Sequence, residues 1–129
     1  MPLTSIVFYQ EPDGDSSVVE WLKELNETHP KAYDKCRAAL SRLALHGHEL
    51  RRREADYLRN GIHELRVHFG SVNYRLLFFF HGQTISVVVH GLTKEAAVPA
   101  TDIKRAIARK DAFTANPLIH TYRGEIDDG

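Results

Sequence analysis

Three cationic side chains and a histidine fall close together in the stretch from Gly61 to Lys94. Arg66 and His68 alternate with apolar residues, so in an extended chain they point to the same side. Arg75 interrupts the most apolar run of the chain, and Lys94 follows the next apolar run. A sheet face with these side chains would form a shallow basic cleft that holds a phosphate and stabilises charge developing on it.

That chemistry would suit a metal-free ribonuclease. RNA supplies its own nucleophile, the 2′-hydroxyl, so the protein needs only proton transfer, positioning and cationic stabilisation. A second interpretation is structural, because an arginine within an apolar strand is costly to bury unless it is paired. In that case Arg75 or Arg66 would form a salt bridge with Glu64 or another carboxylate.

Three strands separated by short turns would position these side chains. The first strand, Ile62 to Phe69, ends at Gly70-Ser71, and the second runs from Val72 to Phe80. The turn His81-Gly82-Gln83 leads to the third, Thr84 to His90. The pattern predicts an antiparallel meander of tight hairpins.

The flanking segments predict an α+β fold. Its small, mostly antiparallel sheet, the meander plus an N-terminal strand, packs against an N-terminal helical hairpin, with a helix near the C-terminus. Residues 1–115 form one domain, and the polar residues 116–129 are expected to be a flexible, loosely attached tail. The flanking elements are expected at Ser5 to Tyr9 (strand), Asp15 or Ser16 to about Thr28 (helix), Lys31 to His46 (helix) and about Thr101 to Phe113 (helix).

The middle of the chain is basic although the formal net charge is zero. Between Lys31 and Lys110 there are fifteen Lys and Arg against seven Asp and Glu. The segment Leu50 to Asn60 has no clear period and is expected to be a loop or a short irregular strand. Within it, Arg51, Arg52 and Arg53 are candidate contacts to an RNA backbone, and Lys104 is another.

Several other classes of function lack their sequence signatures. There is no Gly-rich phosphate loop, CxxC pair or HExxH motif, and the eight histidines are scattered, so neither a metal nor a cofactor is predicted. The single cysteine, Cys36, fits a reducing compartment and the role of a small buried hydrophobe. No apolar run reaches membrane-spanning length and no signal-peptide pattern is seen, which predicts a soluble cytoplasmic protein.

Four short motifs make the chain resemble a known family. They are Glu64-Leu65-Arg66, the run Asn73 to Phe80, the run Val87 to Lys94, and Pro99 followed by a short helix. In this order and spacing they resemble the phage-derived Gp49-like proteins, the HigB branch of the RelE/ParE toxin superfamily. The resemblance covers about residues 8–113.

The resemblance implies a toxin of a type II toxin–antitoxin system with a RelE-like fold. Such toxins cut messenger RNA, usually on the ribosome, and a helix-turn-helix antitoxin neutralises them, so operator DNA would be contacted only through the antitoxin. By motif, Arg75 would bind the scissile phosphate, Arg66 would be a second phosphate contact, and Lys94 would be the basic residue after the third strand. His68 is the best-placed acid or base, because imidazole exchanges protons near neutrality, and Glu64 is the competing base.

Two departures from the family pattern keep other hypotheses open. The segment after the third strand has one lysine, Lys94, beside Glu95, where the family often has a richer basic run. This favours a non-catalytic member that binds its antitoxin and helps to repress its own operon; inhibition of DNA gyrase, as in ParE, is a third possibility. In the tail, His120 and Tyr122 are candidates for the general acid that some superfamily members carry near the C-terminus.

Overall fold

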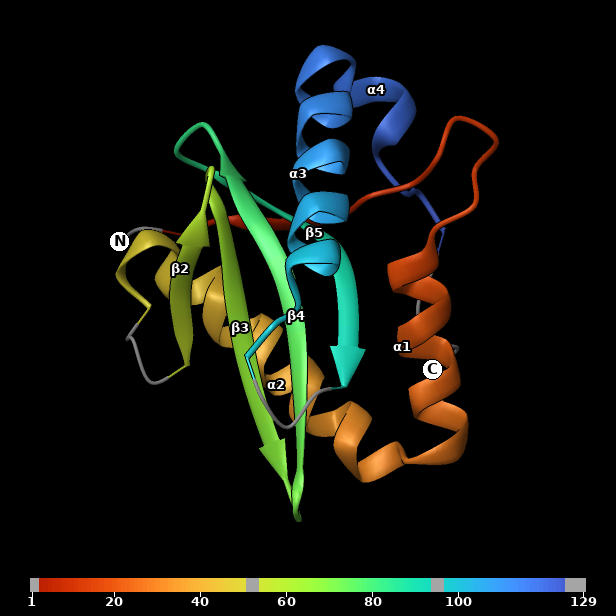
Figure 1. The fold of residues 1–129 in the computed structure, drawn as a ribbon, viewed down its shortest axis with the longest axis vertical. Coiled ribbons are helices and arrows are strands. Elements are labelled where there is room, and N and C mark those ends of the chain that lie inside the picture. The colour runs from red at the N-terminus through yellow and green to blue at the C-terminus, as the bar shows by residue number, and fades with distance from the viewer. Residues whose placement is uncertain (1–2, 51–53, 94–96, 125–129) are drawn as a thin grey trace.

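One sheet with helices on both faces makes up the fold. The computed structural model describes residues 3–50, 54–93 and 97–124. The sheet order is β1-β5-β4-β3-β2, with one parallel pair, β1 with β5, and antiparallel pairs elsewhere. The expected α+β class with a mostly antiparallel sheet is therefore confirmed. In chain order (Figure 1) the elements are β1 (Ser5–Phe8), α1 (Ser17–Thr28), α2 (Pro30–His46), the 3-10 turn η1 (Gly47–Glu49), β2 (Ala55–Arg59), β3 (Ile62–Phe69), β4 (Val72–His81), β5 (Ile85–Thr93), α3 (Ala100–Ala115) and α4 (Pro117–His120).

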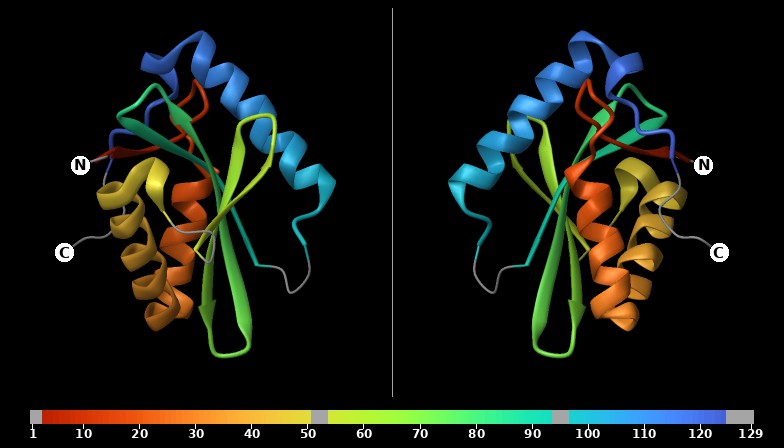
Figure 2. Two further views of the ribbon diagram at one scale, coloured as in Figure 1. Left: turned by 90° about the vertical axis from the view of Figure 1, so that its left-hand side faces the viewer. Right: turned by 90° about the vertical axis from the view of Figure 1, so that its right-hand side faces the viewer.

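The helical hairpin covers one face of the sheet, as the sequence predicts (Figure 2). The Ser16 hydroxyl accepts a hydrogen bond from the Val19 N–H and so caps the start of α1. His29 separates the helices, and Pro30 occupies the first turn of α2, where no N–H is needed. Cys36, on the buried face of α2, lies in the core, and burial raises the pKa of its thiol to about 12, so it remains protonated at neutral pH.

Helix α3 covers the opposite face at one end of the sheet (Figures 1 and 2). Ala106 and Phe113 are its buried residues, and the ring of Phe113 packs edge-on against Phe79 of β4. Gly61, in the β2–β3 turn, lies against the Lys110 side chain, so α3 is close to that turn. The other end of the same face, toward the β3–β4 turn, carries the polar side chains described below.

The structure decides one open alternative and extends one strand. Residues 55–59, expected as a loop or a short irregular strand, form the short edge strand β2, which pairs with β3 and has a register shift between Tyr57 and Arg59. β5 continues past the expected end at His90 to Thr93, because Thr93 still pairs with Tyr74 of β4. The extension brings the end of β5 to the level of Arg75.

The first part of the tail differs from the expected loose segment. Pro117–His120 forms the short helix α4, and Thr121 bridges to Tyr9 just after β1. The His120 ring stacks on Tyr9 with centroids 4.9 Å apart, and its Nδ1 lies 2.8 Å from the Gln10 carbonyl oxygen. These contacts explain why the polar segment 117–120 packs against the residues that follow β1.

No helix in the described part of the chain is both long and apolar enough to cross a membrane.

Candidate phosphate-binding site

The β3–β4 hairpin places Arg66 directly opposite Arg75. Its two-residue turn begins with Gly70, whose φ of +63° lies in the left-handed region that glycine tolerates. Directly opposite residues of an antiparallel pair point to the same face, with Cβ atoms about 5 Å apart. Like charges in such a pair repel each other, so the two guanidinium groups need a carboxylate or a bound anion between or beside them.

Glu64 is the carboxylate that the structure provides for Arg75. Arg75 Nη1 donates a hydrogen bond to Glu64 Oε1 over 2.9 Å. The Arg75 side chain is 13% exposed and that of Glu64 is 8% exposed, so this is a nearly buried ion pair. The Nε atom of Arg75 is fully buried and has no hydrogen-bond partner among the described residues. The structural interpretation of Arg75, left open by the sequence, therefore accounts for part of its role.

Arg66 differs from Arg75 in its exposure. It lies on the same face but is exposed to solvent. Its backbone N–H is bonded to the Glu54 carbonyl over 2.7 Å, which fixes the strand beneath the side chain. Arg66 is thus the solvent-accessible member of the pair.

His68 lies two residues further along β3 and points to the same side. It is directly opposite Asn73, and His68 Nδ1 lies 2.7 Å from Asn73 Oδ1. Because an amide oxygen only accepts hydrogen bonds, Nδ1 carries the proton and Nε2 of the neutral ring has a free lone pair. The imidazole is exposed to solvent and could take a proton from a neighbouring hydroxyl.

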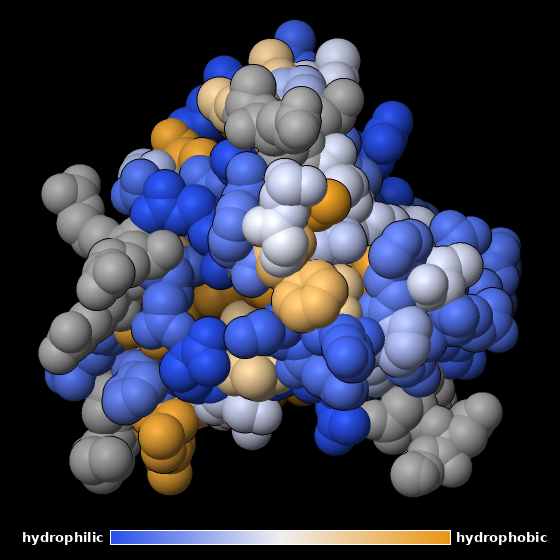
Figure 3. Space-filling model, turned by 90° about the horizontal axis from the view of Figure 1, so that it is seen from below, coloured by the Kyte–Doolittle hydropathy of each residue, from blue (hydrophilic) through white to orange (hydrophobic). Residues whose placement is uncertain are grey.

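These side chains lie in rows across one face of the sheet. Glu64, Leu77 and His90 form one row, and Arg66, Arg75 and Leu92 form the next. His68 and Asn73 follow toward the β3–β4 turn, beyond the part of the face that α3 covers (Figures 1 and 2). Viewed from that turn, hydrophilic side chains surround a smaller apolar area (Figure 3). We refer to Glu64, Arg66, His68, Asn73 and Arg75 together as the phosphate cluster, the candidate site for an anion.

The other predicted site residues do not all join this cluster. Lys104 is exposed on α3, a separate element from the two strands of the cluster. Lys94 and the triplet Arg51, Arg52 and Arg53 lie outside the described residues. His120 and Tyr122 pack beside β1, because His120 stacks on Tyr9 and the Tyr122 N–H is bonded to the Phe8 carbonyl.

A second polar group on the same face was not expected from the sequence. His90 Nε2 lies 2.6 Å from Asp102 Oδ1 of α3, and Arg109 Nη1 donates to the Val89 carbonyl over 2.7 Å. Arg109 Nη1 also lies 3.4 Å from His90 Nδ1, and its Nε is 3.8 Å from Glu11 Oε2. Both ring nitrogens of His90 are therefore engaged, and the group fastens α3 to β5.

The charge state of His90 follows from its surroundings. Burial lowers the pKa of His90, and Arg109 and Arg105 lower it further, while the hydrogen bond to Asp102 acts in the opposite direction. Burial outweighs Asp102, so at neutral pH the contact is a hydrogen bond from a neutral imidazole. The pKa of His63 on β3 is also lowered, by burial first and by His48 second.

Folding stability should fall when the pH drops below about 6.5, the ordinary value for histidine. His63 and His90 have lowered pKa values in the folded state, so the unfolded chain binds more protons in this range. The two histidines contribute their full share of folding stability at pH values above the ordinary pKa of histidine. This stability is lost as the pH falls below that pKa. Urea unfolding at pH 7.5 and pH 5.5 measures the loss, and the double variant His63→Gln/His90→Gln should show a smaller difference. An equal difference in the variant would contradict the assignment to these two residues.

The described residues contain no group of side chains that could bind a metal ion. Within residues 3–50, 54–93 and 97–124, no three His, Cys, Asp or Glu side chains are grouped as a metal site would require. Arginine and histidine side chains dominate the phosphate cluster instead. Such a donor set suits an anion.

Most of the chain matches a known protein family. The family model described as phage derived protein Gp49-like (DUF891) matches residues 20–111. This range begins within α1 and ends within α3, so it includes the entire phosphate cluster. A search of curated proteins finds none that matches.

Proposed function

The chain belongs to the family of phage-derived Gp49-like proteins, and from this membership and the phosphate cluster we propose that it is the toxin of a type II toxin–antitoxin pair. Its activity is metal-free endonucleolytic cleavage of messenger RNA, with the message held on the ribosome. Its partners are the ribosome, the message and a cognate helix-turn-helix antitoxin. The alternative of gyrase inhibition has no specific support in the described site.

The observation that carries the proposal is the cross-strand pair of Arg66, which is exposed, and Arg75, which is nearly buried beside it. Two arginines placed directly opposite each other repel, and a phosphate bound between them would relieve that repulsion. Glu64 forms an ion pair with Arg75, the nearly buried member of the two. Arg66 is the member that is exposed to solvent and therefore accessible to an RNA phosphate.

Each member of the phosphate cluster takes one role in the proposed reaction. His68 Nε2 accepts the proton of the 2′-hydroxyl, whose oxygen attacks the adjacent phosphorus. The bond from phosphorus to the 5′-oxygen breaks, that oxygen takes a proton from water, and a 2′,3′-cyclic phosphate remains on the upstream fragment. Arg66 stabilises the charge on the nonbridging oxygens, and Arg75 supports it from within the sheet.

The surroundings of Glu64 favour His68 as the proton acceptor. The Glu64 carboxylate is nearly buried and committed to Arg75. If Glu64 accepted a proton as the base, its carboxylate would lose its charge, and the positive charge of Arg75 would be left without a partner in the sheet. The exposed His68 has a ring nitrogen directed away from its Asn73 contact and is not subject to this cost.

The direct test is induction of the chain in cells followed by mapping of RNA 5′ ends. The proposal expects growth arrest and new ends within translated messages, with a 2′,3′-cyclic phosphate on the upstream fragment. A purified reaction with messenger RNA, with and without ribosomes, should give cleavage mainly in their presence. Intact messages in arrested cells would contradict the nuclease activity.

Replacement of His68 should lower cleavage by about 100- to 10,000-fold, the usual contribution of a general base. The variant His68→Gln keeps a side chain that can bond to Asn73 but has no basic nitrogen. Single-turnover cleavage rates measure the effect. The matched control is His46→Gln, an exposed histidine at the end of α2. If the rate of His68→Gln stays within twofold of the parent, Glu64 becomes the candidate base.

The ion pair between Arg75 and Glu64 favours one second candidate. If that pair serves only stability, the chain is a non-catalytic family member that binds its antitoxin and contributes to repression of the operon. Co-expression discriminates between the two candidates. A tight complex with the antitoxin, together with normal growth when the chain is induced alone, supports the non-catalytic candidate.

A further inference from the structure

A small hollow lies at one edge of the sheet, between the 3-10 turn η1 and strands β2, β3 and β4. Its volume is about 210 Å³, which is below the range of about 300–1,000 Å³ that drug-sized ligands occupy. A hollow of this size with planar walls suits a single flat heterocycle. We call it the ring hollow, because it is lined by the planar rings of His48, Tyr57, His63, Phe78 and Phe80.

The five rings form one connected cluster. The His48 ring stacks on Phe80 with centroids 3.8 Å apart, and the His63 ring stacks on Phe78 with centroids 5.3 Å apart. His63 also meets Tyr57 and Phe80 edge-on, and both centroid distances are 5.1 Å. His63 therefore lies at the centre of the cluster, with Tyr57 on one side of it and Phe80 on another.

Two of these rings reach solvent. Tyr57 is 56% exposed, and His48 is exposed as well. The Gly61 N–H donates a hydrogen bond to the Tyr57 hydroxyl over 3.1 Å, so the turn between β2 and β3 holds the exposed ring in place. An aromatic ring whose orientation is already fixed can stack on a guest ring with little further loss of conformational freedom.

The imidazole of His63 has hydrogen-bonding capacity that the described residues do not use. Its side chain is half-buried, and burial lowers its pKa, so the ring is neutral at pH 7. A neutral imidazole has one N–H donor and one lone pair, and neither is hydrogen-bonded to residues 3–50, 54–93 or 97–124. A guest with polar atoms along its edge would satisfy a nitrogen that packing leaves unused.

The lining of the ring hollow favours a nucleobase over a phosphate. None of the described residues that line it is lysine or arginine. In the sequence, however, the lining residues Leu50 and Ala55 are joined by a segment that contains Arg51, Arg52 and Arg53, which lie outside the described residues. Aromatic rings for the bases and cations for the backbone are the two features that single-stranded nucleic acids need.

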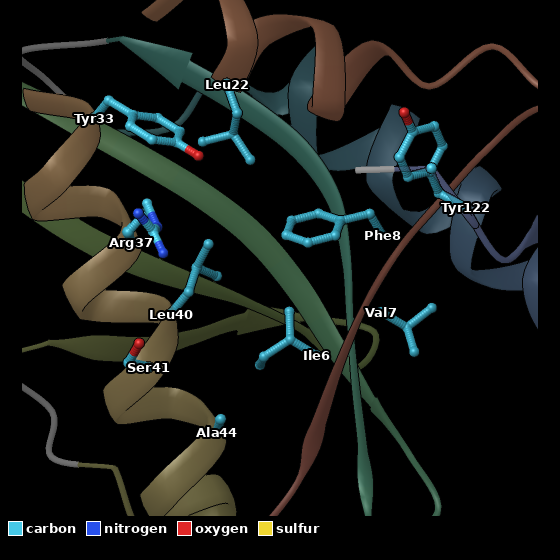
Figure 4. Close-up of a pocket in the computed structure, with 11 residues that line it drawn as sticks. Ile6, Val7, Phe8, Leu22, Tyr33, Arg37, Leu40, Ser41, Ala44 and Tyr122 are labelled. Carbon is cyan, nitrogen blue, oxygen red and sulfur yellow. The ribbon is translucent and has the colours of Figure 1, made fainter. Parts of the chain in front are cut away.

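A larger cavity between β1 and the helical hairpin is a weaker candidate for a ligand site (Figure 4). Its volume is about 530 Å³, and Arg37, Tyr122 and Gly124 are among its lining residues. The chain itself thus forms one wall of this cavity and continues from it beyond Gly124. That cavity gives no reason to place a separate molecule in it.

We propose that the ring hollow binds an unstacked base of single-stranded RNA. The base stacks on the exposed ring of Tyr57 and directs its hydrogen-bonding edge toward His63. The site itself does not depend on nuclease activity. Only the choice of RNA over a free nucleotide rests on the proposed function.

The position of the ring hollow allows one RNA strand to reach both sites. His63 and Glu64 are consecutive in β3, so the ring hollow and the phosphate cluster lie on opposite faces of the sheet. β2 is the last strand of the sheet, and neighbouring strands are about 4.8 Å apart. An RNA strand bound at Arg66 of β3 therefore has a short path around this edge to Tyr57.

The probe for the test is a short 2′-O-methylated RNA in which one base is 2-aminopurine. Methylation removes the nucleophile, so the RNA is not cleaved and its binding is measured whether or not the chain is a nuclease. The fluorescence of 2-aminopurine falls when the base stacks on a ring. We expect saturable quenching on titration with the full chain in the absence of ribosomes.

Tyr57→Ala should weaken binding of this RNA by about 5- to 150-fold, the usual effect of removing one stacking ring. Tyr57→Phe keeps the ring and should stay within about threefold of the parent, because it loses only the bond to Gly61. His63→Leu removes the polar edge contact and should weaken binding by about 2- to 10-fold. The matched control is Leu118→Ala, which removes a side chain that is 75% exposed on α4 and should leave the affinity unchanged. Thermal melting of each variant checks that it folds.

Three results would overturn the proposal. The first is equal affinity of the parent and Tyr57→Ala, or no quenching by the parent. The second is full affinity of His63→Leu together with a loss for Tyr57→Ala, because the base would then stack on Tyr57 outside the ring hollow. The third comes from competition with adenosine monophosphate: if it binds as tightly as the RNA, the occupant is a free nucleotide.

The base site and the nuclease proposal fail in different ways. If the 2-aminopurine RNA binds as expected but the induced chain cleaves no messages, the nuclease proposal fails and the base site remains. If messages are cleaved and Tyr57→Ala binds the probe as tightly as the parent, the base site fails and the nuclease proposal remains.

Discussion

Arg66→Ala is expected to reduce RNA cleavage by about 100- to 1,000-fold, the usual effect of removing one charged donor from a transition state. Folding should be little affected, because the side chain is exposed and its removal relieves repulsion with Arg75. Surface substitutions of this kind change the free energy of unfolding by about 0.5 kcal/mol or less. The measurement combines single-turnover cleavage with urea unfolding, and the expected result is an inactive protein of normal stability.

Arg59→Ala is the matched control for this prediction. Arg59 is also an exposed arginine of the sheet, but it lies on the edge strand β2 and outside the phosphate cluster. Its removal lowers the net charge equally and should leave the cleavage rate within about threefold, the range of a nonspecific electrostatic contribution. Equal losses for Arg59→Ala and Arg66→Ala would mean that overall charge, not the placement of Arg66, determines the activity.

Arg75→Ala should act on stability as well as activity. The nearly buried Glu64 would lose its partner, and removal of one member of a buried ion pair typically costs about 3–5 kcal/mol. We expect a correspondingly lower urea midpoint with an unchanged slope, because the fold itself is the same. A loss below about 1 kcal/mol would show that solvent reaches Glu64 and compensates for the missing arginine.

A double variant separates the structural role of Arg75 from its role toward RNA. Replacement of a buried ion pair by apolar residues of similar volume is often neutral or stabilising. Glu64→Leu/Arg75→Met should therefore fold about as stably as the parent and, under the nuclease proposal, remain inactive. If the double variant regains full cleavage, Arg75 contributes only to folding, and Arg66 with His68 suffices for the reaction.

The arrangement of the phosphate cluster was largely predictable from the sequence. A two-residue turn at Gly70-Ser71 pairs Phe69 with Val72, and counting back from this pair sets Arg66 opposite Arg75 and His68 opposite Asn73. Asn73 belongs to one of the sequence motifs, but its position opposite His68 becomes clear only when residues are paired outward from the β3–β4 turn.

Contacts between distant elements were beyond the reach of sequence patterns. The bond between His90 and Asp102 depends on where α3 crosses the sheet, which no local period specifies. The packing of His120 on Tyr9 likewise required knowledge that the tail returns to β1. The sequence left a loop and a short irregular strand open for β2, because an edge strand buries little of either face and so lacks clear alternation.

The parallel pairing of β1 with β5 has a consequence for synthesis of the chain. Val7 pairs with Val87, so the first strand emerges from the ribosome some eighty residues before β5, the strand that it pairs with. At about 5–20 residues per second, synthesis of this stretch lasts several seconds. During that time β1 cannot form its pairing with β5, which joins residues far apart in the sequence. The newly made N-terminal segment is thus open to capture by other chains before the β3–β4 hairpin has been synthesised.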